Sequence, residues 1–351
     1  MAETSKLKAW ISAARLRTLP LSISGILVGS AFAYQRIDYW NALATSYQNS
    51  SIEKTGLTKL IDAFNFEFNY IIPILALITT LGFQVLSNFA NDYGDGVKGT
   101  DNEDRIGPMR ALQSGIISPK EMKNAMIITA VLTLISAILL IYVSLGVEKL
   151  LISLFFLVLG IAAIWAAIKY TVGDNAYGYR GLGDVFVFIF FGPVSVMGIY
   201  FLITKGLEWI MIFPSITVGL LSVAVLNLNN MRDIESDKKA GKNTIVVKMG
   251  LAKAKLVHYG FLIIAFLCAV LSVFNIYGHI VITNYYNNHD SYINASYIAL
   301  LPLLAFIPLF IHLFKVKRTE SPALLDPELK KVALSTFFFA LLYVMSVWVV
   351  S

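Results

Sequence analysis

Long apolar runs alternate with short polar segments along the whole 351-residue chain. About 20 helical residues cross the hydrocarbon core of a bilayer, and a helix gives every backbone group a partner within its own segment. The runs are close to this length, so the pattern predicts an all-α, polytopic membrane protein. The nine predicted spans are residues 18–35, 70–90, 124–145, 150–170, 184–203, 208–229, 256–277, 295–314 and 332–350.

The composition agrees with a membrane protein. Hydrophobic residues make up 57% of the chain and charged residues 14%, whereas about a quarter of the residues are charged in an ordinary soluble domain. A single cysteine, Cys268 in the seventh predicted span, excludes an internal disulfide.

Lysine and arginine residues lie mostly on one side of the predicted membrane. The N-terminal arm and the loops after spans two, four, six and eight hold 23 of the 28, and the other side holds 5. Because basic loops stay in the cytoplasm, we expect a cytoplasmic N-terminus and a location in the inner (cytoplasmic) membrane. The net charge of +6 then reflects topology and anionic lipid, and no nucleic-acid partner is expected.

We expect a single domain over residues 1–351, interrupted by three longer segments between spans. Residues 37–69 form an extracytoplasmic loop, and residues 91–123 and 230–255 form cytoplasmic loops. Both cytoplasmic loops begin with acidic residues, and they are the expected active-site loops.

Each acidic cluster continues a polar strip from the end of a helix. Span two ends in QVLSNFANDYGD (84–95), and span six ends in NLNNMRDIESD (227–237). Residues four apart lie on one helix face. The side chains on the two strips are Asn88, Asn91, Asp92, Asp95, Asn229, Asp233 and Asp237.

Two readings of these strips are open. Acids at a helix end beside the cytosol can be solvated loop residues. Polar groups at membrane depth are costly, however, and usually serve a site inside the protein. Two clusters of the same kind, four helices apart, favour a site.

The residue types indicate the ligand. Aspartate oxygens with no nearby cysteine or histidine suit Mg²⁺, which completes its shell with water and phosphate oxygens. The interleaved basic residues suit a phosphate group, and no Walker-type nucleotide loop is present. A diphosphate at a membrane surface beside an apolar interior suggests a polyprenyl diphosphate. These basic residues are Lys98, Arg105, Arg110, Arg232 and Lys242.

Two motifs resemble those of the UbiA superfamily of intramembrane prenyltransferases: N-D-x-x-D, here NDYGD (91–95), and D-x-x-x-D, here DIESD (233–237). Four further stretches resemble the 1,4-dihydroxy-2-naphthoate polyprenyltransferase branch of that family. They are RLRTLP (15–20), RIGPMR (105–110), AYGYRGLGD (176–184) and DKKAGKNT (237–244).

The resemblance implies nine helices around a central cavity and a Mg²⁺-dependent reaction. A polyprenyl group would pass from its diphosphate to 1,4-dihydroxy-2-naphthoate, with loss of CO₂ and diphosphate, to give demethylmenaquinone. Asp92, Asp95, Asp233 and Asp237 would be the catalytic metal ligands. Gly99 replaces a third aspartate of the wider family, so Asp101 is a further candidate ligand.

The remaining candidates are expected to bind the two substrates. Lys169 and Arg180 could instead anchor the chain at the membrane surface. Tyr177 and Tyr179 are expected to be interfacial aromatic residues, and the four histidines are expected to be structural. The substrate-binding candidates are Asn88, Asn91, Lys98, Arg105, Arg110, Lys169, Tyr170, Arg180, Asp184, Asn229, Arg232 and Lys242.

Two other functions are open. The same chemistry could use another acceptor, such as 4-hydroxybenzoate or homogentisate. A secondary transporter also has repeated helices and intramembrane carboxylates, but its sites lie near the bilayer midplane. The acids of this chain lie at helix ends among basic residues, which favours the enzyme.

Overall fold

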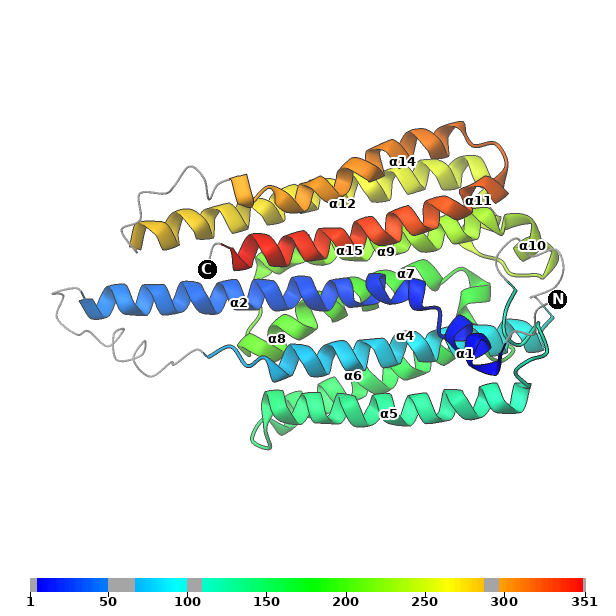
Figure 1. Cartoon of the computed structure of the whole chain (residues 1–351), viewed down its shortest axis with the longest axis horizontal. Coiled ribbons are helices and arrows are strands. Elements are labelled where there is room, and N and C mark those ends of the chain that lie inside the picture. Colours follow the sequence, from blue (N-terminus) through cyan, green and yellow to red (C-terminus); the bar gives the residue numbers. More distant parts are fainter. Residues whose placement is uncertain (1–4, 50–66, 100–108, 287–296, 350–351) are drawn as a thin grey trace.

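The protein is an elongated bundle of helices that lie side by side (Figure 1). The structure, a computed structural model, describes residues 5–49, 67–99, 109–286 and 297–349, and these contain no strand. Seven of the described helices are long and apolar enough to cross a membrane, and an eighth crossing results if α1 and α2 form one bent span. The prediction of an all-α protein with many spans is confirmed.

The helices follow the predicted spans in order, with short helical segments between them. The first half contains α1 (Lys6–Ala14), α2 (Leu19–Asn49), α4 (Ile71–Val97), α5 (Pro119–Leu145) and α6 (Leu150–Lys169). The second half contains α7 (Gly183–Ile189), α8 (Gly198–Thr204), α9 (Ile212–Arg232), α10 (Ile234–Lys239), α11 (Ile245–Met249), α12 (Leu251–Tyr286), α14 (Ile307–Arg318) and α15 (Asp326–Trp348).

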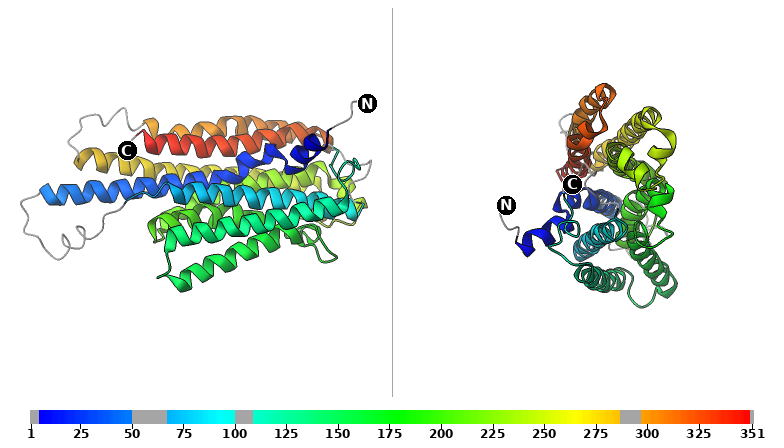
Figure 2. Two further views of the ribbon diagram at one scale, coloured as in Figure 1. Left: turned by 60° about the horizontal axis from the view of Figure 1, so that its bottom comes forward. Right: turned by 90° about the vertical axis from the view of Figure 1, so that its right-hand side faces the viewer.

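Helix α2 packs against α4, α8, α12 and α15, and in the end-on view it lies inside the ring of other helices (Figure 2). It continues to Asn49, so residues 37–49 of the expected loop 37–69 are helical. Ile37–Asn49 contains neither glycine nor proline, so no residue there stops the helix. Residues 50–66 lie outside the described ranges.

The fifth predicted span is not a regular α-helix. Between α7 and α8, residues Phe190–Met197 form a π-helix that contains Pro193. A side chain on Gly25 of α2 would come within 2.3 Å of Ser195 Oγ, and one on Gly192 within 2.7 Å of the Ser215 carbonyl oxygen of α9. The missing side chains therefore let α2, the π-helix and α9 approach one another closely.

The eighth predicted span, 295–314, is also irregular. Leu301–Phe306 form a 3₁₀-helix that leads into α14, and a proline lies in the first turn of each segment. Proline lacks the backbone N–H group that a continuous helix requires. This break explains why the region is not among the seven long spans.

A buried polar chain joins α12, α14 and α15. His258 Nε2 lies 2.8 Å from His312 Nε2, and His312 Nδ1 lies 2.6 Å from Glu328 Oε2. Lys331 Nζ donates to Glu328 Oε1 at 2.6 Å. The two histidines and Glu328 are almost fully buried, so each needs such a partner.

The end of α4 and the start of α10 lie at the same end of the bundle as α1, opposite the C-terminus (Figure 1). A small core forms there, in which Trp10 of α1 packs edge-on against Phe89 of α4 with ring centres 5.6 Å apart. Helix α9 ends at Arg232 and α10 begins at Ile234. The helix assignment breaks at Asp233, but the Asp233 N–H still donates to the Asn229 carbonyl at 3.0 Å and the Asp237 N–H to the Asp233 carbonyl at 2.8 Å.

Candidate functional site

Asp92 of the first motif is buried in the last turns of α4. Its Oδ2 accepts a hydrogen bond from the Ala111 backbone N–H, and its Oδ1 accepts one from Leu112, both at 3.2 Å. The carboxylate therefore fixes the segment that follows residue 109 against α4. A side chain on Gly94 would come within 2.6 Å of Thr171 Oγ1, so glycine is required for α4 to meet the loop after α6.

Asp95 lies about one turn further along α4 and is also buried. Tyr179 donates its hydroxyl hydrogen bond to Asp95 Oδ1 at 2.8 Å. Arg110 Nη2 lies 3.3 Å from Asp95 Oδ2. The carboxylate is thus held by a phenol from the loop after α6 and a guanidinium from the loop after α4.

Asp233 of the second motif pairs with its neighbour Arg232. Arg232 Nε donates to Asp233 Oδ1 at 2.7 Å, and Nη2 donates to Oδ2 at 2.6 Å. The same guanidinium also contacts Asp326 of α15 at 2.5 Å and Asn229 Oδ1 at 2.9 Å. Arg232 therefore links α9 to α15, and its role in binding phosphate stays a prediction.

Asp237 and Lys242 bring the second motif to the first. Lys242 Nζ lies 3.5 Å from Asp237 Oδ1. Burial alone lowers the pKa of Lys242, but the charges of Asp95 and Asp237 together raise it above its usual range. Burial raises the pKa of Asp237 to about 6, against the opposing effect of Lys242. The two acidic motifs therefore share one electrostatic site.

Tyr179 connects the two motifs a second time. Its hydroxyl binds Asp95, and its backbone carbonyl accepts a hydrogen bond from the Asn243 N–H at 2.9 Å. Lys98 Nζ lies 4.0 Å from the centre of its ring, and Lys242 Nζ lies 5.5 Å from it. Both ammonium groups are within the range of cation–π attraction.

The loop after α6 places Tyr170 beside this site. The Tyr170 carbonyl accepts a hydrogen bond from Gly178 at 3.0 Å. Burial raises the pKa of the Tyr170 hydroxyl, and Asp184, Asp95 and Asp237 raise it further in that order. Tyr170 and Asp184 therefore lie near the acidic motifs, as the sequence predicted.

Lys169 and Arg180 lie in the same loop region as Tyr170 but contact different groups. Within the described ranges, neither forms an ion pair with an aspartate of the two motifs. Arg180 is exposed, and its carbonyl accepts a hydrogen bond from Lys248 at 2.8 Å. A side chain on Gly173 would lie 3.2 Å from Lys169 Nζ, so Lys169 folds over its own loop.

The asparagines of the first strip make contacts between helices. Asn88 Nδ2 donates to the Ala14 carbonyl at 2.9 Å and to Thr18 Oγ1 at 3.2 Å, which ties α4 to the junction of α1 and α2. Asn91 Oδ1 accepts from Thr171 Oγ1 at 3.3 Å. Asp101 and Arg105 lie outside the described residues.

Sequence reasoning assigned Tyr179 no chemical role. Its position in AYGYRGLGD, a stretch quoted for the family resemblance, was the signal that could have identified it. Asp326, which pairs with Arg232, lies far from both motifs in the sequence, and no spacing pointed to it.

The donor set suits a hard cation. Asp237 Oδ2 is buried and has no hydrogen-bond partner among the described residues, so it has lone pairs for a ligand. Among the described residues, no three His, Cys, Asp or Glu side chains are arranged to enclose a metal ion. Mg²⁺ requires no such cage, because it binds one or two carboxylates and completes its shell with phosphate oxygens and water.

The fold and comparisons with known proteins identify the chain as a membrane-embedded prenyltransferase. It belongs to the UbiA prenyltransferase family, whose model matches residues 63–324. The chain is 39% identical over 338 residues to a 1,4-dihydroxy-2-naphthoate octaprenyltransferase of Haemophilus influenzae, covering 96% of this chain and 95% of that protein.

Two further similarities agree with this assignment. An Escherichia coli protein with the same description is 42% identical over 276 residues, and the match covers 79% of this chain and 79% of that protein. The fold resembles the structure of a UbiA homolog from Archaeoglobus fulgidus bound to DMAPP and Mg²⁺. The TM-score is 0.56 at 14% identity, over 96% of this chain and 99% of that one.

Proposed function

We propose that the chain transfers a polyprenyl group from polyprenyl diphosphate to 1,4-dihydroxy-2-naphthoate, with loss of CO₂ and diphosphate, to give demethylmenaquinone. The observation that carries the proposal is the meeting of two buried acidic motifs around Lys242 and Tyr179. The names of the Haemophilus influenzae and Escherichia coli relatives support the acceptor. The DMAPP and Mg²⁺ bound to the Archaeoglobus fulgidus homolog support the donor and the metal.

In this proposal the diphosphate lies between the two motifs. Asp95 and Asp237 hold Mg²⁺, with Asp92, Asp233 and the undescribed Asp101 as further ligands. The metal supplies Lewis-acid neutralisation of the diphosphate. Lys242, Arg110 and Lys98 bind phosphate oxygens directly, since each lies beside a motif aspartate or the Tyr179 ring. The undescribed Arg105 is proposed for the same role.

The chemical step breaks the allylic C–O bond, and diphosphate leaves with the electron pair. The electron-rich ring carbon that bears the carboxylate attacks the allylic carbon. The carboxylate then leaves as CO₂, and its bonding electrons restore the aromatic ring. Tyr170, half-buried near the acids, offers an aromatic face to the developing allylic cation.

We further propose nine spans around a central cavity, a cytoplasmic N-terminus and a site that opens toward the cytoplasm in the inner membrane. The basic loops support this orientation, because Lys242 and Arg110 of the site belong to them.

The proposal is tested with purified protein in nanodiscs, a polyprenyl diphosphate, Mg²⁺ and 1,4-dihydroxy-2-naphthoate labelled in its carboxylate. We expect release of labelled CO₂ in step with a prenylated product, both abolished by chelation of Mg²⁺. Parallel reactions receive 4-hydroxybenzoate or homogentisate. Prenylation of one of these without turnover of the naphthoate would overturn the acceptor, and failure with every acceptor would overturn the reaction.

A further inference from the structure

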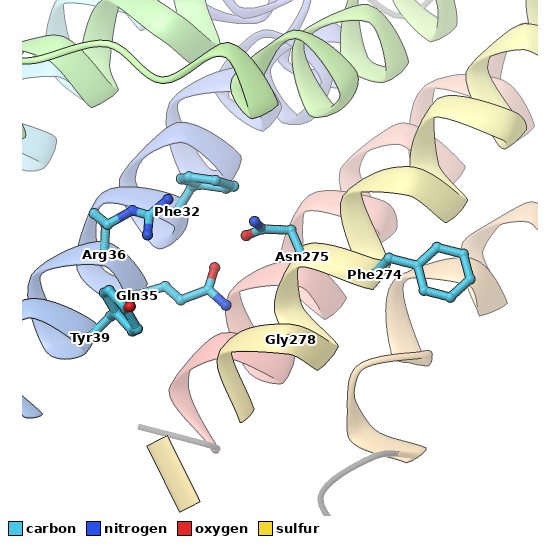
Figure 3. Close-up of a pocket in the computed structure, with 7 residues that line it drawn as sticks. All are labelled: Phe32, Gln35, Arg36, Tyr39, Phe274, Asn275 and Gly278. Carbon is cyan, nitrogen blue, oxygen red and sulfur yellow. The ribbon is translucent and has the colours of Figure 1, made fainter. Parts of the chain in front are cut away.

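A pocket with both polar and apolar walls lies at the end of the bundle opposite the acidic motifs. It has a volume of about 230 Å³ and is formed by α2 and α12. Its lining residues are Phe32, Gln35, Arg36, Tyr39, Phe274, Asn275 and Gly278 (Figure 3). We call it the outer-end pocket.

The pocket is far from the proposed reaction. Thr18, at the other end of α2, contacts Asn88 beside the acidic site. At 1.5 Å per helical residue, Gln35 lies roughly 25 Å further along α2. This distance is close to the thickness of the hydrocarbon core, about 30 Å. The outer-end pocket therefore lies near the opposite membrane boundary.

Gln35 is the feature that indicates a ligand. It is 3% exposed, yet neither its amide nitrogen nor its amide oxygen has a hydrogen-bond partner among the residues that the structure describes. A buried amide without a partner is costly. In Figure 3 the amides of Gln35 and Asn275 point toward each other from the two helices across the pocket. A ligand between them can accept a hydrogen bond from the NH₂ group of one amide and donate one to the carbonyl oxygen of the other.

The charge in the pocket is already balanced. Arg36 pairs with Glu208, which also accepts a hydrogen bond from the Tyr200 hydroxyl at 2.6 Å. The Arg36 guanidinium lies 5.5 Å from the centre of the Tyr39 ring. Because the arginine has an acidic partner, the pocket favours a neutral headgroup over a phosphate.

The walls suit a flat ring. Phe32 lies in the wall, fixed by an edge-on contact with Tyr200, with ring centres 5.5 Å apart, and the half-buried Tyr39 offers aromatic surface. Outside the helix's own backbone, no atom of the described part of the chain lies within 4 Å of the position that a Gly278 side chain would take. The volume is below the roughly 300 Å³ at which pockets for drug-sized ligands begin, so it suits a headgroup whose tail lies outside.

We propose that the outer-end pocket binds the ring headgroup of a polyprenyl quinone or quinol. The carbonyl or hydroxyl oxygens of the ring satisfy the amides of Gln35 and Asn275, and the prenyl tail extends along the apolar surface of the bundle. The choice of ligand rests on the proposed function, since that reaction makes a lipid of this class. The pocket would then hold product at the far membrane boundary.

The test is a binding titration of the full chain in phosphatidylcholine nanodiscs, with a naphthoquinone carrying a short prenyl chain. Trp40 is next to Tyr39, with ring centres 5.7 Å apart, so quenching of tryptophan fluorescence reports binding. Loss of one hydrogen bond weakens binding about tenfold. We expect this loss in Gln35→Leu and in Asn275→Leu. The matched control Asn124→Leu, an exposed amide on α5, should bind like the wild type.

Equal affinity in all four proteins would overturn the proposal. It would also be overturned if phosphatidylglycerol in the nanodisc abolished the quinone quenching, because the pocket would then be a phospholipid site. Gln35→Leu and Asn275→Leu lie on different helices, so a folding defect in one variant leaves the other as a test. The elution volume of each variant shows whether it is folded. The titration contains no prenyl diphosphate or acceptor, so its result is independent of prenyl transfer. Failure of the carboxylate-release assay would refute the reaction alone.

Discussion

The Tyr179→Phe substitution tests whether the two motifs form one working site. It removes the 2.8 Å hydrogen bond to Asp95 but keeps the aromatic ring beneath Lys98. A hydrogen bond to a charged group contributes about 1.5–3 kcal/mol. If that energy serves to orient Asp95 for the metal and diphosphate, kcat/KM for the prenyl donor should fall roughly 10- to 150-fold.

The matched control is Tyr177→Phe, two residues away. The Tyr177 hydroxyl donates to the Ala166 carbonyl at 2.9 Å, so its loss removes a neutral hydrogen bond of about 0.5–1.5 kcal/mol. We expect a lower Tm with kcat/KM close to wild type. Steady-state rates are measured at several Mg²⁺ concentrations for both variants. Unchanged kinetics in Tyr179→Phe, or equal kinetic losses in both variants, would refute the reasoning.

Three further substitutions separate metal binding, phosphate binding and stability. Asp237 carries a carboxylate oxygen that has no partner among the described residues. Asp237→Asn should therefore abolish product formation while the elution volume stays that of the wild type. Normal turnover would exclude Asp237 as a metal ligand. Arg110→Ala should raise KM for the prenyl donor about tenfold and change kcat less, and an unchanged KM would contradict a phosphate contact. Glu328→Gln should lower the free energy of unfolding by about 1–3 kcal/mol, because His312 and Lys331 lose a charged partner; a thermal melt that matches the wild type would contradict this.

The sequence was sufficient for what depends on hydrophobic length. The spans in α4, α5, α6, α9 and α12 follow their apolar runs, because a membrane requires long helices with internal hydrogen bonds. It was less informative where a proline lies in the middle of a run. Pro193 lies in a π-helix, and the region before α14 becomes a 3₁₀-helix, which an apolar run alone does not reveal.

The acidic motifs were also recognisable, because charge at a helix end in so apolar a chain is conspicuous. Their detailed contacts were not. Helical spacing placed Asn229, Asp233 and Asp237 on one strip, but it did not reveal that α9 ends and α10 begins around Asp233. The pairing of Arg232 with Asp326 joins residues 94 apart in sequence, and no local pattern encodes such a contact.

The contacts also suggest why the acidic residues coexist in a buried site. Asp95, Asp233 and Asp237 each lie beside a cation of this chain, namely Arg110, Arg232 and Lys242. Unpaired carboxylates so close together would be costly to bury. If this site holds magnesium and diphosphate as proposed, Lys242 would bind a phosphate oxygen and Asp237 would bind the metal. Magnesium alone would leave Lys242 without an anionic partner, and diphosphate alone would face the uncompensated carboxylates. We therefore expect magnesium and diphosphate to bind better together than either one alone.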